Sequence, residues 1–228
     1  MAVALVVQHV AHEDPGRLAD WLPAYGVELD VRHPYAAVPL PSTVDADALI
    51  VMGGPMGAND DDVVSWLPAT KALLADAVAR GVPTLGVCLG AQLLAVATGG
   101  RVERGAHGPE IGLGEVSGDG RDSLLVGGTF PVVQWHYDTV TELPDGATLL
   151  ASSERYPVQA FRVGKAAWGL QFHVEAAPAL VASWAAAEDR DVEEIVAPIR
   201  SADRVIARVG EELSKRFAAV VNRGSVTG

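Results

Sequence analysis

The sequence predicts an α/β fold with a mixed, mainly parallel central sheet that carries helices on both faces, followed by C-terminal helices. Short apolar runs alternate with helical stretches up to about residue 100, as in chains that build a parallel sheet. These runs are continuously apolar, which is typical of strands buried on both faces. Beyond that point, strand-like runs follow one another with only turns between them, which indicates an extension that makes the sheet mixed.

The first half of the chain opens with a strand-helix-strand unit and continues the same alternation. A glycine follows each expected helix, at Gly26, Gly81 and Gly99, and glycine commonly ends a helix. The third strand leads directly into a glycine-rich loop, residues 53–57. The expected strands are residues 2–10, 27–31, 48–52 and 82–87, and the expected helices are residues 17–25, 63–80 and 89–98.

The second half is expected to be β-rich as far as residue 177 and helical beyond it. Its strand-like runs are residues 110–116, 131–135, 148–151, 158–163 and 167–173. Apolar residues then recur at three- and four-residue spacing, which predicts helices over 180–187 and 192–217. Because no linker-like stretch divides the chain, we expect residues 178–228 to be a helical extension packed on the domain formed by residues 1–177.

Composition and charge narrow the functional classes. Hydrophobic residues make up 49% of the chain and charged residues 20%, as in proteins with a large buried core. The formal charge of −12 argues against binding to nucleic acid, which depends on cationic side chains. The single cysteine permits no internal disulfide, and we find neither a leader-like segment nor an apolar run of about 18 residues. We therefore expect a cytoplasmic protein with no membrane association.

The single cysteine, Cys88, lies where a buried strand is expected to turn into a helix. Gly86 and Gly90 flank it at two residues to each side, which is the spacing of a nucleophile elbow, a tight turn that pushes its central side chain out above the sheet. The N-terminus of the following helix favours negative charge on the sulfur. The alternative is a buried structural cysteine, the commonest fate of a lone cysteine in an apolar segment.

A base and its orienting partner are expected in residues 171–175. A cysteine nucleophile needs a base that moves its proton and a group that holds the ring of that base. In extended backbone, residues two apart point to the same side, so Glu175 can accept the ring proton of His173. The alternative is a solvent-exposed pair in a loop.

Backbone amides near Cys88 are candidates for an oxyanion hole. The amide of Leu89 follows the nucleophile directly, and loop 53–57 offers a second amide, for which Gly54 is the best candidate. Taken alone, this loop is equally well explained as a plain glycine-proline turn.

Together these motifs resemble the class I, or triad, glutamine amidotransferase family, whose fold is flavodoxin-like. The specific matches are residues 86–92 (GVCLGAQ) and 171–175 (QFHVE), and the resemblance runs from about residue 2 to residue 175. It implies hydrolysis of the glutamine side-chain amide to glutamate and ammonia through a glutamyl thioester. The triad would be formed by Cys88, His173 and Glu175.

Within the family the chain looks most similar to stand-alone proteins related to the glutaminase part of GMP synthase. That likeness lies in residues 110–112 (EIG) and 135–139 (WHYDT). It further implies that the substrate is held at matching positions, of which Gln92 lies one helical turn after Cys88. A helix-surface glutamine is the alternative for that residue. The implied substrate-binding residues are Gly54, Met56, Leu89, Gln92, Tyr137 and Asp138.

Two departures from the family pattern affect the expected substrate. Val174 stands where the family usually has proline between the triad histidine and glutamate. Tyr137 occupies a position that is often small, so the pocket is expected to be narrower or shaped for another γ-glutamyl compound. His136, next to it, is expected to shape the pocket.

No cofactor and no metal ion are expected. His33 and His107 lack a second ligand at metal spacing, no Walker-type phosphate loop occurs, and residues 117–123 are interpreted as a turn. The chain therefore cannot activate an ammonia acceptor by itself, which leaves three hypotheses. It is a glutaminase with a synthase partner, a stand-alone γ-glutamyl hydrolase or transferase, or a non-catalytic regulator that retains the fold.

Overall fold

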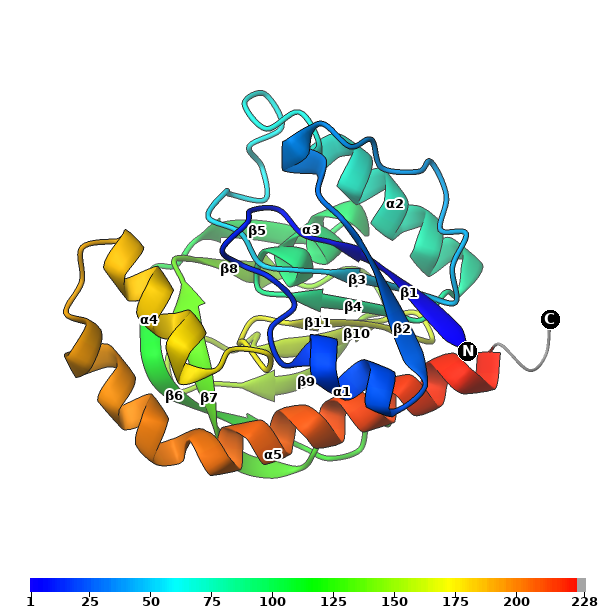
Figure 1. Cartoon of the computed structure of the whole chain (residues 1–228). Coiled ribbons are helices and arrows are strands. Elements are labelled where there is room, and N and C mark those ends of the chain that lie inside the picture. The colour runs from blue at the N-terminus through cyan, green and yellow to red at the C-terminus, as the bar shows by residue number, and fades with distance from the viewer. Residues whose placement is uncertain (225–228) are drawn as a thin grey trace.

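The computed structural model describes residues 1–224 and contains a central nine-stranded mixed sheet within that range (Figure 1). The strand order is β2-β1-β3-β4-β11-β10-β9-β6-β7. The first five strands in this order run parallel, and the remaining pairings are antiparallel. The predicted fold class is therefore confirmed. The strands are β1 (Ala2–Val7), β2 (Val27–Arg32), β3 (Ala48–Val51), β4 (Thr84–Val87), β6 (Glu110–Gly118), β7 (Gly128–His136), β9 (Thr148–Ser152), β10 (Ala160–Val163) and β11 (Ala167–Leu170).

Helices cover both faces of the sheet (Figure 1). On one face, α1 (Leu18–Ala24) and α5 (Val192–Gly224) share a core with alternate residues of β1 and β3. On the other face, α2 (Leu67–Arg80) and α3 (Leu89–Ala97) pack on the intervening residues of the same strands. All four residues of β3 and of β4 are buried, which explains why these runs are continuously apolar.

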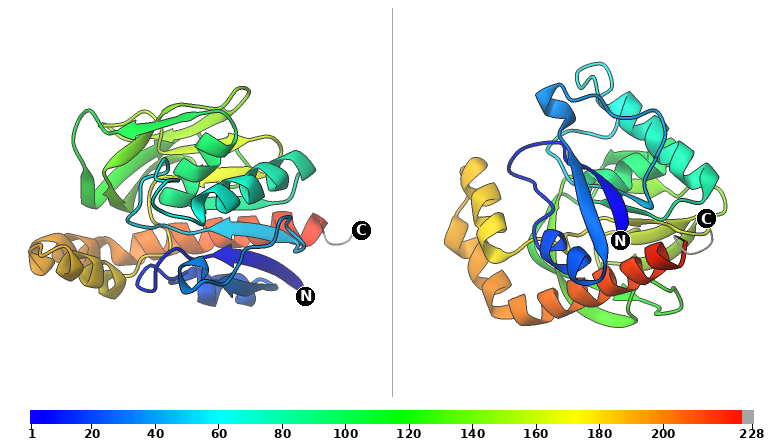
Figure 2. Two further views of the ribbon diagram at one scale, coloured as in Figure 1. Left: turned by 90° about the horizontal axis from the view of Figure 1, so that it is seen from above. Right: turned by 45° about the vertical axis from the view of Figure 1, so that its right-hand side comes forward.

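The C-terminal helices pack along the antiparallel half of the sheet. A third apolar cluster joins α4 (Pro178–Ala187) and the start of α5 to Val133 of β7. Further along, Phe217 of α5 is fully buried and its ring meets Trp168 of β11 edge to face. Figure 2 shows α5 crossing most of the molecule. No helix between residues 1 and 224 combines the length and the apolar character needed to span a membrane.

Several element boundaries differ from the sequence-based expectation. The expected strands 2–10 and 167–173 end earlier, at Val7 and Leu170. The helix expected from residue 63 begins only at Leu67, because Pro68 is favoured in the first turn of a helix. The last helix continues beyond residue 217 to the end of the described chain.

A two-stranded antiparallel ribbon of β5 (Arg101–Arg104) and β8 (Asp138–Glu142) was not anticipated. In β5 only Val102 is buried and the other three residues are charged and exposed. Such a segment lacks the apolar run by which the other strands are recognised. Asp138, the first residue of β8, follows the end of β7 by two residues, and its pairing with Arg104 of β5 holds the ribbon at this edge of the sheet.

Candidate active site

The elbow at Cys88 connects β4 to α3 with a strained backbone. Cys88 has φ 51° and ψ −107°, a region that residues other than glycine rarely adopt. A Cβ atom on Gly86 would lie 2.5 Å from the carbonyl oxygen of Gly90, and one on Gly90 would clash with the carbonyl oxygen of Val51. Both flanking glycines are therefore required by close backbone contacts, and they allow the turn that presents the sulfur.

The Gly90→Ala substitution is expected to lower the free energy of unfolding by about 3 kcal/mol, because the added methyl overlaps the backbone of β3. Urea unfolding measures this change. A matched control is Gly224→Ala, which is also helical; apart from its chain neighbours and its own helix backbone, no heavy atom of residues 1–224 lies within 4 Å of the added methyl. Equal stability of the two variants would contradict the close packing of the elbow.

Strand β11 lies beside β4 and carries the second half of the site. The amide of Cys88 donates to the carbonyl of Leu170 at 2.7 Å, which joins the two strand ends. Beyond the end of β11, the backbone N–H of His173 donates to the carbonyl of Val133 at 2.9 Å. This bond fixes the extended segment that carries His173 and Glu175 at the same edge of the sheet as Cys88.

His173 and Glu175 form a buried pair. Nδ1 of His173 lies 2.7 Å from Oε1 of Glu175, and each side chain is only 2% exposed. Nε2 of His173 and Oε2 of Glu175 are buried without a hydrogen-bond partner in residues 1–224. Nε2 is therefore available to exchange a proton with the sulfur of Cys88 beside it or with a group that enters the site.

The electrostatics of the pair favour an imidazolium. Burial alone would lower the pKa of His173, but the negative charges of Glu175 and of an ionised Cys88 outweigh it, and the pKa is raised well above its ordinary value. In the thiol form, the sulfur of Cys88 lies 3.5 Å from the carbonyl oxygen of Trp135.

A pocket of about 360 Å³ is lined in part by Cys88. All of the predicted substrate-binding side chains except Leu89 also border this pocket. Leu89, His173 and Glu175 are buried and lie outside the lining. Among residues 1–224, no three side chains of His, Cys, Asp or Glu are grouped as a metal site requires. The predicted positions that border the pocket are Gly54, Met56, Gln92, Tyr137 and Asp138.

Gln92 holds neighbouring parts of the site together. Its Nε2 donates to the carbonyl of Asp138 at 3.0 Å and to Oε1 of Gln171 at 3.2 Å, and the residue is only 4% exposed. Nε2 of Gln171 reaches the sulfur of Cys88 at 3.8 Å. The alternative of a helix-surface glutamine is therefore wrong, and the amide protons of Gln92 are engaged by protein groups.

Tyr137 reaches the turn between the two C-terminal helices, which sequence reasoning had not linked to the site. Its hydroxyl donates to Oε2 of Glu188 at 2.7 Å and accepts from Arg190. Glu188 also accepts from Nε1 of Trp135 at 2.9 Å and borders the pocket. The stretch beyond residue 177 therefore contributes Glu188 to the lining of the pocket, beside Tyr137.

Glu13 is a second pocket residue that sequence reasoning missed. It lies in the loop between β1 and α1 and borders the same pocket as Cys88. Burial raises its pKa to about 7, and the negative charges of Glu175 and Glu188 add to the shift, while His173 opposes it. The only available signal was its position after the carboxyl end of a parallel strand, where ligands bind in such sheets.

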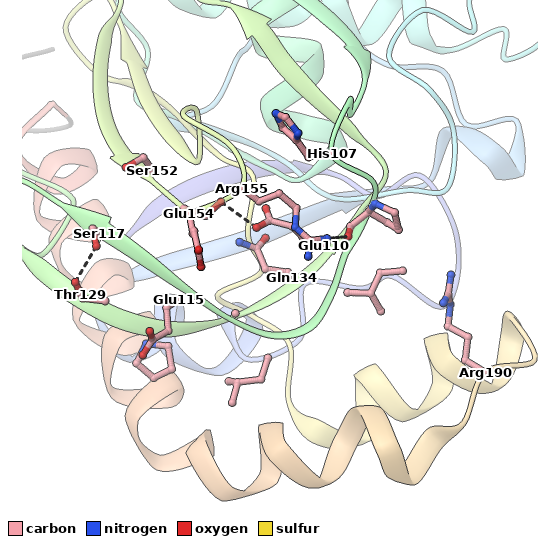
Figure 3. A pocket seen from close by; sticks show the side chains of 16 residues that line it. His107, Glu110, Glu115, Ser117, Thr129, Gln134, Ser152, Glu154, Arg155 and Arg190 are labelled. Atoms are coloured by element: carbon pink, nitrogen blue, oxygen red, sulfur yellow. Dashed lines mark hydrogen bonds between the residues drawn. The ribbon is translucent and has the colours of Figure 1, made fainter.

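A larger hollow of about 1170 Å³ lies beside β6 and β7. Figure 3 shows Arg190 at the edge of this hollow, across from Glu110 and Gln134. Oε2 of Glu110 lies 3.0 Å from Nε2 of His136, and His136 borders the pocket at Cys88. The Glu110–His136 pair thus stands between the two hollows, which agrees with a pocket-shaping position for His136.

Comparison with known proteins identifies the family. The family described as glutamine amidotransferase class-I matches residues 17–181. A subunit of the glutamine-hydrolysing GMP synthase of Halobacterium salinarum is 36% identical over 141 residues, which are 60% of this chain and 70% of that protein. The GMP synthase of Lactobacillus acidophilus is 36% identical over 132 residues, which are 56% of this chain but only 24% of the length of that protein.

Two solved structures are similar to this chain over nearly its whole length. A glutamine amidotransferase from Thermotoga maritima has a TM-score of 0.86 at 28% identity, covering 95% of this chain and 98% of that one. A glutamine amidotransferase from Methylobacillus flagellatus has a TM-score of 0.85 at 30% identity, and the match covers 98% of this chain and 95% of that one. The likeness thus includes the C-terminal helices, and with the match over residues 17–181 it shows that the chain belongs to the class I glutamine amidotransferase family.

Proposed function

We propose that the protein hydrolyses the side-chain amide of glutamine to glutamate and ammonia through a γ-glutamyl thioester on Cys88. The observation that carries the proposal is the meeting of three strand ends. Cys88 follows β4, and the buried His173–Glu175 pair follows the adjacent β11. Loop 53–57 follows β3 on the other side of β4.

In the first half of the reaction the Cys88 thiolate attacks the carboxamide carbon. The carbonyl oxygen becomes an oxyanion, which the amides of Gly54 and Leu89 are proposed to bind. Leu89 is the first residue of α3, and the first amides of a helix have no partner within it. The carbon–nitrogen bond then breaks as the His173 imidazolium gives its proton to the leaving nitrogen, so that ammonia departs and the thioester remains.

In the second half the neutral His173 takes a proton from water. The resulting hydroxide adds to the thioester carbon, the carbon–sulfur bond breaks, and the thiolate–imidazolium pair is restored. The product is the γ-carboxylic acid of glutamate, which ionises at neutral pH. Glu175 moves no proton in this scheme, since its bond to Nδ1 only orients the ring and stabilises its charge.

We further infer that ammonia is passed to a synthase partner. Ammonia in water at neutral pH is mostly protonated and no longer nucleophilic, so a productive transfer needs a bound acceptor enzyme. Relatives of this chain are named as one subunit of a glutamine-hydrolysing GMP synthase, which supports a partner of the synthase class. Adding candidate synthases to the purified protein and measuring glutamate release tests this, since docking of the right partner is expected to raise turnover.

A second candidate function is a stand-alone hydrolase or transferase for other γ-glutamyl compounds. The observation that favours it is that Tyr137 and Glu188, which Arg190 contacts, add polar groups to the lining of the pocket. Comparing kcat/KM for glutamine and for γ-glutamyl alkylamines distinguishes the two, because a preference for the alkylamines would support this candidate. A non-catalytic role is disfavoured because the buried His173–Glu175 pair lies next to a pocket that is lined by Cys88.

Glu175→Ala is expected to lower kcat for glutamine about 10- to 100-fold, a smaller loss than removal of His173 causes, because the orienting group transfers no proton. Loss of the carboxylate also removes a charge that raises the pKa of His173, so less imidazolium is present at neutral pH. Steady-state ammonia release measures both variants. Equal losses for Glu175→Ala and His173→Ala would contradict this division of roles.

A further inference from the structure

The carboxyl group of Glu13 reaches the reacting centre, although its segment is remote from the triad in the sequence. A Cβ atom on Gly53 would lie 2.7 Å from Oε2 of Glu13, 3.2 Å from Cε1 of His173 and 3.7 Å from Cβ of Cys88. One methyl-sized volume therefore touches all three side chains. The Cε1 atom is bonded to both ring nitrogens, Nδ1 and Nε2, so the carboxyl group of Glu13 lies near that edge of the imidazole.

Among the carboxyl groups that line the pocket, that of Glu13 is the one without a partner in the described part of the chain. Asp60 accepts from the amide of Gly57 at 2.7 Å, Asp138 pairs with Arg104 at 3.5 Å, and Glu188 pairs with Arg190 at 2.8 Å. Within residues 1–224, the carboxyl of Glu13 makes no hydrogen bond and no ion pair. Burying a carboxyl group, even in part, without a partner is costly, and burial raises the pKa of Glu13 to about 7.

We propose that Glu13 contacts the substrate and binds the leaving nitrogen. This proposal rests on the proposed function, because it is that reaction which places the nitrogen next to Nε2 of His173. The ionised carboxyl accepts an N–H of the carboxamide, and after His173 has protonated the nitrogen it accepts an N–H of the departing ammonia. No bond to Glu13 forms or breaks, so the group contributes orientation and charge.

Two consequences separate this role from a structural one. The contact requires an N–H on the leaving atom, so it operates on amides and not on esters. It should therefore affect acylation by glutamine and leave the later hydrolysis of the thioester unchanged, because the nitrogen has departed by then. A residue that merely supports the fold of the loop would affect both kinds of substrate alike.

The test compares L-glutamine with the γ-methyl ester of L-glutamate, using the full-length protein and measuring kcat/KM, which reports acylation. Glu13→Ala is expected to lower kcat/KM for glutamine tenfold or more, since it removes a charged hydrogen bond. The same substitution is expected to change kcat/KM for the ester less than threefold. Glu13→Gln keeps an acceptor oxygen without the charge, so an intermediate loss on glutamine is expected. The control is Glu28→Gln. Glu28 is an exposed residue of the edge strand β2, so this substitution should leave kcat/KM unchanged for both substrates.

The outcomes are distinguishable. If Glu13→Ala lowers kcat/KM equally for the amide and for the ester, Glu13 has a structural role. That result would overturn the inference while the proposed function stands. An unchanged kcat/KM for glutamine would also overturn it. A wild-type protein that hydrolyses neither substrate would refute the proposed function itself, and this inference with it.

Discussion

Replacing Cys88 by alanine is expected to lower glutamine hydrolysis by a factor of about 10³ or more, because no other residue can form the thioester. Cys88 is the only cysteine of the chain, so no neighbouring thiol can substitute. Parallel measurement of glutamate and ammonia release from purified protein checks the loss.

The alanine variant should keep its fold, which makes the result interpretable. Cys88 is buried, and the hydrogen bonds of its sulfur are long: it donates to the carbonyl of Trp135 at 3.5 Å and accepts from Gln171 at 3.8 Å. The strained backbone of the elbow is set by Gly86 and Gly90 and not by the cysteine side chain. We expect the melting temperature to change by only a few degrees. An alanine variant that retains a tenth of the wild-type turnover would refute the assignment of the nucleophile.

His173→Ala is expected to cause a loss of about 10³-fold or more at neutral pH, because the same ring stabilises the thiolate and protonates the leaving nitrogen. The pH dependence should change as well. The imidazolium of the wild-type protein persists to high pH because its pKa is raised, so activity falls only when that proton is lost. In the variant, thiolate forms only as the pH rises, so the residual activity should increase with pH.

The matched control for this variant is His33→Ala. His33 lies outside the pocket lining and interacts with Gln8 and Tyr35, so its removal should leave turnover and its pH profile near those of the wild type. A His173→Ala protein that retains the wild-type pH profile would contradict the role given to the ring.

The elbow and the hydrogen-bonded His173–Glu175 pair could be predicted because their signals are local. Gly86, Cys88 and Gly90 are close in sequence, and the structure shows why both glycines are needed. His173 and Glu175 are two residues apart and form the bond that this spacing suggests. The rule that parallel strands bring their carboxyl ends to one edge then places the two motifs together.

The rest of the pocket depends on tertiary packing that leaves no periodic signal. Glu13 comes from an irregular loop, and Glu188 comes from a turn after α4 that reaches the pocket only because α4 packs on β7. The ribbon of β5 and β8 was missed for a related reason, since its charged residues resemble a loop when read alone. Sequence reasoning therefore located the groups that we propose to react, and it missed the groups that distant contacts place around them.

The most direct test of the central claim is covalent labelling with a chloromethyl ketone analogue of glutamine, followed by peptide mapping. The account predicts one label per chain, on Cys88, with the rate of labelling reduced by glutamine and greatly reduced in His173→Ala. Labelling of Cys88 that is indifferent to glutamine, or labelling confined to another residue, would contradict a glutamine site at this elbow.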